Sequence, residues 1–403
     1  MFSYEYDIRH DNVNYRTLQS LSTHETDGHK ACSDCPYFDD FARFLDYYGV
    51  PDFGDRWILA AASYDTTDFA GQRGQANFGS TPKVGIAEAM IIGILELNVL
   101  LQIIQGVEQA GARCVEGCGS VSCNEESIHL LDQSVALYCG SLEGEDGTGE
   151  GVFQYALAQR RSVEFGVNNP GETTNDRLMG MFQDYQDLLL QGSCAGIESR
   201  KKSIISLLKV PVVQSVLRFA YIRDHVPALD ADDSPKAEAF GAAYAAAVLP
   251  LVHECHRADA NTIHENLRIG SEDSTVSFHR VKEALEKNYD CMGISCADIG
   301  GIWTGEEFAE GAGPCGVQSK ATPTTHNENS PATTAVSLLG ISLSVMVVMF
   351  GAHMYRKKRQ SRGGGGSGGV GFGGVGFGGG IRRRRGHARA TSGSNIAAVS
   401  NIT

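Results

Sequence analysis

Apolar positions along the chain follow the three- and four-residue spacing of amphipathic helices, and strand-like alternation of useful length is missing. The longest such pattern, residues 83–110, is apolar almost throughout, with Glu88, Glu96 and Glu108 as its only acids. A helix of this composition is expected to pack on several sides. The fold class is therefore predicted to be mainly α, with further helices over residues 38–48, 127–142, 203–224, 236–257 and 277–289.

The order of the predicted helices repeats once along the chain. Residues 83–110 followed by 127–166 resemble residues 201–224 followed by 234–270, because each set reads as a long apolar helix, a linker, a second helix, a loop and a third helix. This order predicts two pseudo-repeated helical bundles. Ligands often bind between such halves, so we expect a ligand between the two bundles.

A different apolar pattern lies near the C-terminus. Residues 333–355 are apolar or small apart from His353, and they run directly into the basic cluster Arg356 to Arg359. About 20 such residues span a ~30 Å hydrocarbon core, and a basic cluster that follows them stays on the cytoplasmic side. The sequence therefore predicts a single-pass transmembrane helix in the plasma membrane, with the N-terminal domain outside the cell.

The remaining segments complete a predicted domain order. The N-terminal segment is polar and has no apolar stretch, so we expect it to lack its secretory signal peptide. The composition after the membrane helix is too rich in glycine and arginine to bury an apolar core. The predicted order is an N-terminal segment (1–36), an extracellular helical domain (37–317, with halves at about 37–170 and 171–317), a stalk (318–332), a transmembrane helix (333–355) and a disordered, basic, Gly-rich cytoplasmic tail (356–403).

The segments on the two sides of the predicted membrane helix differ in net charge. Ten of the 34 Lys and Arg residues lie in 356–403, which holds no Asp or Glu, so the rest of the chain carries 24 basic against 48 acidic residues. Nucleic-acid binding needs basic contacts to phosphate, so no nucleic-acid partner is expected. An acidic outer part suits the attraction of cations, and simple solubility explains it equally well.

Eleven cysteines indicate an oxidising compartment. Several of them are closely spaced, and outside the cell such clusters predict disulfides that staple loops. A zinc site is a weaker explanation, because two Cys-x-x-Cys units with matched spacing are missing. The clusters are Cys32 with Cys35, Cys114 with Cys118 and Cys123, and Cys291 with Cys296.

The first candidate site begins at Tyr138 and continues through an acidic, Gly-rich stretch to Gly151, with Glu143 among its carboxylates. Phenol and carboxylate oxygens suit a hard cation, and the glycines let the backbone approach a ligand closely. It is not an EF-hand, since the Asp-x-Asp-x-Asp-Gly order is missing. A solvated acidic turn between two helices explains the stretch without any ligand.

Two further clusters contain side chains that could bind a metal ion. His253-Glu254-Cys255-His256 is expected to put both imidazoles on one helix face, where they could reach one metal ion. The spacing is not the His-Glu-x-x-His of zinc proteases. In the other cluster Tyr48 and Asp52 stand near the end of a predicted helix. Polar core residues and aromatic packing are the plainer explanations of the two clusters.

Three segments together resemble the algal Fe-assimilating protein family. The form with a C-terminal membrane helix and a basic tail is similar to the phytotransferrins, the iron-starvation-induced surface proteins of diatoms and other marine algae. The resemblance covers about residues 37–315, and its most specific part is the Gly-Ser-Leu-Glu-Gly block. The segments are Phe44-Leu45-Asp46-Tyr47-Tyr48-Gly49 with Asp55-Arg56-Trp57, Leu137-Tyr138-x-Gly-Ser-Leu-Glu-Gly, and Phe153-Gln154-Tyr155-Ala156-Leu157-Ala158 followed by Arg160.

The resemblance implies capture of ferric iron at the cell surface with carbonate as a synergistic anion, followed by endocytosis and release as the vesicle acidifies. It also implies endocytic machinery and a ferric reductase as partners. Hard Fe³⁺ favours phenolate and carboxylate and tolerates imidazole, so the candidate ligands are drawn from the three clusters. They are Tyr48, Asp52, Tyr138, Glu143, His253 and Glu254, with Arg161 as the candidate for carbonate.

Two other functions compete with an iron receptor, which is not an enzyme. A structural or adhesive surface protein would need only the disulfides and the stalk. A surface metallohydrolase would use His253, Glu254 and His256, but the histidine spacing and the lack of a Gly-x-Ser-x-Gly block speak against it.

Overall fold

The computed structural model describes residues 3–5, 15–17, 39–118, 121–140, 151–225, 233–272 and 275–316. All of them belong to one unit by their contacts, and this unit ends at Ala321. Several predictions therefore fall outside the described residues, namely those for the membrane helix, the stalk, the tail, Glu143, Cys32 and Cys35.

Helices make up most of the described chain, so the mainly α prediction is confirmed. The described strands are β1 (Ser3–Glu5) and β2 (Tyr15–Thr17), which pair antiparallel. In chain order the helices are α2 (Asp39–Tyr48), α3 (Phe53–Ser63), α4 (Lys83–Ile94), the π-helical η1 (Leu95–Val99), α5 (Leu100–Ala112), α6 (Val121–Cys139), α7 (Gln154–Glu164), α8 (Thr174–Gln191), α9 (Cys194–His225), α10 (Asp233–Cys255), α11 (Arg257–Leu267), α12 (Phe278–Glu286), α13 (Tyr289–Met292) and α14 (Cys296–Ile299).

The helix α8 was not predicted, although the sequence carries its signals. Thr173 and Asp176 form a reciprocal capping box at its start, and Gly192 ends it in the left-handed conformation at φ 63°. Its buried residues recur at helical spacing and include Leu178, Phe182, Tyr185 and Leu189. Reading the cap together with this spacing would have found the helix.

The long apolar pattern over 83–110 forms a helix whose hydrogen bonding changes in the middle. α4 and α5 are joined by the π-helical turn η1, which contains Glu96 and Asn98, both buried. A π-turn inside an α-helix is rare and frequently marks a functional site. The turn therefore singles out two polar residues in an otherwise apolar element.

Gly54 in α3 lies against this π-turn, and we predict that alanine is not tolerated there. A Cβ on residue 54 would overlap Asn98 Oδ1 and stand 3.2 Å from the carbonyl oxygen of Leu97. Overpacking of this kind costs about 1–3 kcal/mol, more than the roughly 0.5–1 kcal/mol that alanine gains over glycine inside a helix. Gly54→Ala should therefore lower the free energy of unfolding measured by urea denaturation.

Gly180 in α8 provides the matched control. It is exposed, and a Cβ there would meet no atom within 4 Å. Gly180→Ala should raise the free energy of unfolding by roughly 0.5–1 kcal/mol. Equal gains in the two variants would show that α3 and η1 do not pack in this way.

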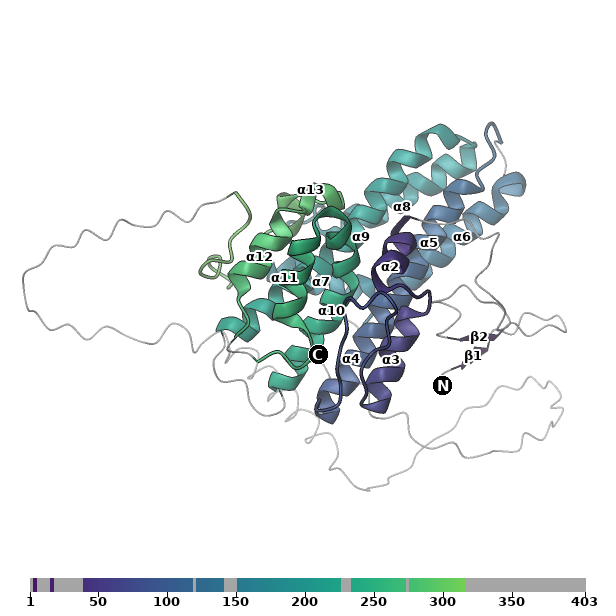
Figure 1. The fold of residues 1–403 in the computed structure, drawn as a ribbon. Helices are drawn as coiled ribbons and strands as arrows, with labels where there is room; N and C mark the ends of the chain where they lie inside the picture. The colour runs from purple at the N-terminus through teal and green to yellow at the C-terminus, as the bar shows by residue number, and fades with distance from the viewer. Residues whose placement is uncertain are drawn as a thin grey trace, which may run out of the picture. The chain divides into compact units, whose positions relative to one another are not determined.

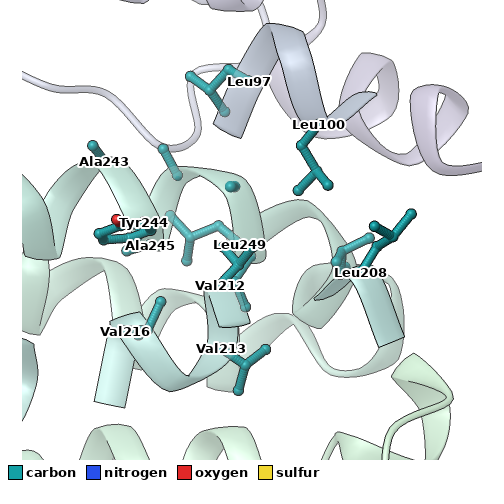
Figure 2. Close-up of a cluster of buried hydrophobic side chains, with 14 of the residues drawn as sticks. Leu97, Leu100, Leu208, Val212, Val213, Val216, Ala243, Tyr244, Ala245 and Leu249 are labelled. Carbon is teal, nitrogen blue, oxygen red and sulfur yellow. The ribbon is translucent and has the colours of Figure 1, made fainter. Parts of the chain in front are cut away.

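The helix α10 lies at the centre of the core. It packs against α2, α4, α9 and α11, and Figure 1 shows it among these helices. Its middle is rich in alanine, and small side chains let neighbouring helices approach closely. In Figure 2 side chains from four elements meet there, including Leu97 of η1, Leu100 of α5, Val212 and Val216 of α9, and Leu249 of α10.

Two described helical spans are long and apolar enough to cross a membrane. They are Lys83–Ala112 and Cys194–His225, and 72% and 78% of their most apolar windows are buried inside the structure. Core helices of soluble domains pass the same test of length and composition. Both spans are thus accounted for by packing within the domain.

Four disulfides lie within the described residues. Cys114–Cys194 joins the end of α5 to the start of α9 across 80 residues, and Cys255–Cys291 joins α10 to α13. Of the closely spaced clusters with described cysteines, Cys118 and Cys123 form a pair, whereas Cys291 and Cys296 each bond a more distant partner. Cys114–Cys194 and Cys255–Cys291 therefore link elements far apart in the chain, which spacing alone did not predict.

Candidate functional site

The structure brings two of the predicted clusters together where α2 packs against α10. Tyr48, the last residue of α2, donates a hydrogen bond from its hydroxyl to the carbonyl oxygen of Ala246 in α10, at 2.7 Å. The preceding residue, Tyr47, lies edge-on to the ring of His253, with the ring centroids 5.1 Å apart. Residues separated by about 200 positions in the chain thus form one site, which we call the α2–α10 site.

His253 has an unusual environment in this site. Its side chain is 7% exposed, and among the described residues neither Nδ1 nor Nε2 has a hydrogen-bond partner. Burial lowers the pKa of the imidazole, and the charges of Arg73 and Arg257 lower it further against the opposing effect of Asp46. A neutral imidazole with unused nitrogens is the form that binds a metal ion.

Tyr47, rather than Tyr48, supplies the phenol nearest to His253. Tyr47 is 1% exposed, and burial raises the pKa of its phenol while the charge of Arg73 lowers it. The guanidinium carbon of Arg73 lies 5.7 Å from the centre of the Tyr47 ring, and Nε donates to the carbonyl oxygen of Tyr47 at 3.0 Å. A cation beside a buried phenol favours its ionised form.

Tyr48 has a structural role in the same place. Its ring is fully buried against Phe53 and Phe69, and its hydroxyl donates a hydrogen bond to the carbonyl oxygen of Ala246. Burial raises the pKa of this phenol well above its ordinary value. Of the two adjacent tyrosines, Tyr47 and not the predicted Tyr48 therefore lies beside the ring of His253.

Charged side chains surround the site on the α2 side. Arg43 forms ion pairs with Asp40 and with Glu254, the residue after His253. Asp40 is buried and also pairs with Lys209 at 3.0 Å. Glu254 is half exposed, so its carboxylate lies at the edge of the site and is held there by Arg43.

His256 does not share a helix face with His253, and this prediction is wrong. The helix α10 ends at Cys255, and His256 is an extended residue at φ −154° that begins α11. Its Nδ1 pairs instead with Asp259 at 3.0 Å. The two imidazoles do not share a helix face because α10 ends between them.

The other predicted ligands are placed elsewhere or have their own partners. Asp52 stands at the start of α3, where Arg56 Nε pairs with its carboxylate at 2.8 Å. Arg161 in α7 donates from Nε to Ser215 Oγ at 2.8 Å and forms an ion pair with Glu164. Both side chains are therefore held by neighbours outside the α2–α10 site.

Tyr138 lies on α6 in a hydrogen-bond network with α8. Its hydroxyl donates to Asn175 Oδ1 at 2.6 Å, and the amide of Asn175 donates to the carbonyl oxygen of Tyr155 and to Gln159 Oε1. The phenol is fully buried, and burial raises its pKa well above the ordinary value. The geometry fits a structural tyrosine.

We predict that Tyr138→Phe weakens the fold and does not change the response to ferric ion. Removing the hydroxyl leaves the buried Asn175 oxygen without its donor, which costs about 1–3 kcal/mol. Urea denaturation measures this loss, and titration with ferric ion measures binding. Loss of ferric binding in a variant with wild-type stability would return Tyr138 to the ligand set.

Glu96 on the π-turn is a buried acid that was not among the predicted site residues. It is 1% exposed, and Gln154 Nε2 donates to its Oε2 at 3.0 Å. Burial raises the pKa of Glu96 to about 8, against the opposing effects of Gln154 and the charge of Arg161. The signal in the sequence was an acid in the middle of a strongly apolar helix.

Within the described ranges, no group of three or more His, Cys, Asp or Glu side chains is placed to hold a metal ion. A metal in the α2–α10 site would therefore need the phenol of Tyr47, and an anion or water to complete its coordination. Comparisons with protein-family models, curated proteins and solved structures found no match. A function for this domain must therefore be inferred from the side chains of the α2–α10 site.

Proposed function

We propose that the domain binds ferric iron at the cell surface and carries it into the cell, and that it is not an enzyme. The observation that supports this most directly is His253, which is buried against Tyr47 with both ring nitrogens unused among the described residues. Phenolate and imidazole together suit Fe³⁺, which is hard but tolerates imidazole. A buried imidazole without partners is otherwise costly, so a ligand explains its retention.

The metal would also offset the cost of ionising Tyr47. Burial raises the pKa of this phenol, so the phenolate forms only beside strong positive charge. Ferric iron supplies that charge when it displaces the phenolic proton. Asp46 and Glu254 are the carboxylates nearest in sequence to these two residues; Asp46 is largely exposed and Glu254 is half exposed.

A carbonate ion is proposed to complete the coordination, held by Arg73. Arg73 faces the Tyr47 ring, and its side chain is partly exposed, whereas the predicted Arg161 is buried with Ser215 and Glu164. Arginine binds planar oxyanions through two parallel N–H groups. Acid would protonate both carbonate and His253, which weakens the site in the direction that release in an acidified vesicle requires.

The proposed cellular location is the plasma membrane. The apolar run 333–355 and its basic flank favour a single-pass anchor in the plasma membrane with the domain outside. The proposed pseudo-repeat would relate the helices from α4 to α7 to those from α9 to α11, since Gly166 and Gly270 follow their last helices, both at positive φ. An endocytic adaptor and a ferric reductase would act with the receptor.

The test is a visible absorption spectrum of the purified full chain with ferric ion. We expect a phenolate-to-iron charge-transfer band that requires bicarbonate and fades when the pH is lowered to that of an endosome. If the folded protein shows no band with or without bicarbonate, tyrosine does not bind iron here. The structural or adhesive alternative would then be favoured.

A further inference from the structure

The segment between α3 and α4, residues 64–82, forms a hairpin that we call the strap. Its two arms are joined by hydrogen bonds from Thr67 N to the carbonyl oxygen of Ala76, at 2.9 Å, and from Phe78 N to that of Asp65, at 3.0 Å. At its base Phe78 is buried against Trp57, with ring centroids 5.3 Å apart. The base is therefore fixed in the core, and the tip is the part that reaches the α2–α10 site.

The tip of the strap rests on the last residues of α2. Gly71 N donates to the carbonyl oxygen of Tyr48 at 2.8 Å. At Gly74, which has φ 65°, an added Cβ would stand 2.8 Å from Tyr47 Cε1 and 2.9 Å from Tyr48 Cε1. Glycine is required at this position because no side chain fits between the strap and the two rings.

Arg73 fastens the tip to α2. Its Nε donates to the carbonyl oxygen of Tyr47 at 3.0 Å, and another of its N–H groups donates to the carbonyl oxygen of Asp46. These carbonyls lie at the C-terminal end of a helix, where a cation is favoured. The side chain is 36% exposed, so water can compete for each of these bonds.

Backbone strain is concentrated in the same segment. In the described chain the non-glycine residues at positive φ are Tyr64, at 56°, and Gln72, at 55°. Tyr64 begins the strap and Gln72 lies at its tip, next to Arg73. Such conformations are unfavourable for residues with a side chain and persist only where neighbouring contacts enforce them.

The contact beneath the strap is incomplete. A small cavity of about 10 Å³ lies between Gly74, Gln75 and Ala76 of the strap and residues of α10 and α11. Across it, His264 Nε2 lies 3.0 Å from the carbonyl oxygen of Gln75, its hydrogen-bond partner. Phe69, on the arm that leads to the tip, is fully buried against the Tyr48 ring, with the ring centroids 4.4 Å apart. Packing therefore holds this arm, and the polar contacts hold residues 70–75 beyond it.

We infer that the strap is a gate, and that its tip must leave α2, with Arg73 releasing the helix end, before a ligand can reach Tyr47 and His253. With the tip in place Tyr47, which Gly74 and Arg73 contact, is 1% exposed. His253, which lies against the Tyr47 ring, is 7% exposed, so a hydrated ion has too little room to approach either side chain. The inference rests on the proposed function for the identity of the ligand. The opening itself does not depend on iron.

The test measures access to His253 in the metal-free full chain. Diethyl pyrocarbonate modifies neutral imidazole, and mass spectrometry compares its rate at His253 with that at His256, whose side chain is 60% exposed. The reaction is run at about pH 8, above the ordinary pKa of an imidazole. We expect slow labelling of His253 in the wild type and at least about tenfold faster labelling in Arg73→Ala, which loses charge-assisted hydrogen bonds.

Two further variants make the test specific. Gly74→Ala should also speed labelling of His253, because the added methyl group pushes the tip off the rings. Arg200→Ala, which removes a surface ion pair with Asp184, should leave the rate unchanged. Labelling of His253 as fast as His256 in the wild type, or wild-type rates in both strap variants, would overturn the gate.

Iron kinetics separate the gate from the proposed function. In stopped-flow mixing with ferric ion and bicarbonate, Gly74→Ala should develop the charge-transfer band faster than the wild type. Faster labelling without any iron band supports the gate and rejects the iron site. An iron band whose rate is the same in Gly74→Ala, with unchanged labelling, supports the site and rejects the gate.

Discussion

Replacing Tyr47 by phenylalanine should abolish the charge-transfer band of the ferric protein and weaken iron binding far more than any other single tyrosine change. Tyr47 supplies the phenol next to His253, and Arg73 lies over its ring. Loss of groups that only support a metal ligand typically costs about 10–100-fold in affinity, so loss of a ligand should cost at least about 100-fold. Titration followed by visible absorption measures both the band and the affinity.

Tyr48→Phe is the matched control, because the two tyrosines are adjacent and both are buried. It removes a hydrogen bond to Ala246 and should cost about 0.5–1.5 kcal/mol of stability while the band persists. His253→Ala should weaken binding and shift the band, since imidazole is a direct ligand in the proposal. A band that survives Tyr47→Phe but is lost in Tyr48→Phe would reverse the assignment of the ligand.

Replacing Glu96 by glutamine should remove the loss of stability that rising pH causes between about 5 and 8. Burial raises the pKa of Glu96 from 4.5 to about 8. Across this window the folded protein keeps a proton that the unfolded chain has lost, so the free energy of unfolding falls as the pH rises. The full shift corresponds to a loss on the order of 4–5 kcal/mol.

Glutamine is close in shape to glutamate, and its carbonyl oxygen can still accept from Gln154. Glu96→Gln should therefore unfold at no lower urea concentration at pH 8 than at pH 5, because the lowered pKa values of His253 and His264 act in the opposite direction, whereas the wild type should be clearly weaker at pH 8. Asp298→Asn provides the control, because Ser295 and Arg177 hold the pKa of Asp298 below its ordinary value despite burial, outside this window. Parallel pH profiles for the wild type and Glu96→Gln would show that Glu96 is not protonated in the fold.

The helices could be predicted from the sequence because their hydrophobic positions repeat locally. The pattern over 83–110 appears as one continuous helical span, and the helix predicted over 38–48 ends at Tyr48. The π-turn within the first of these left no trace in the spacing, since a π-turn shifts the register by a single residue. Its buried acid, Glu96, was visible in the sequence only as an exception to the apolar pattern.

The candidate site was predictable only in part. His253 was selected from the sequence and lies in the α2–α10 site, and Glu254 lies at its edge. Tyr138 was selected for the same reason of residue type, but Asn175 satisfies its hydroxyl. Residue type identifies side chains that are able to bind a metal, whereas burial and hydrogen-bond partners determine which of them are available.

The sequence alone was enough to predict that the described domain is helical, that disulfides crosslink it, and that residues 1–355 are acidic, because these properties depend on local spacing and composition. The tertiary structure decided which of two adjacent tyrosines faces His253. Neighbouring residues on an α-helix point about 100° apart, so Tyr47 and Tyr48 meet different surfaces. Which surface each one meets depends on α10, which lies about 200 residues away and packs on α2 only in the folded chain.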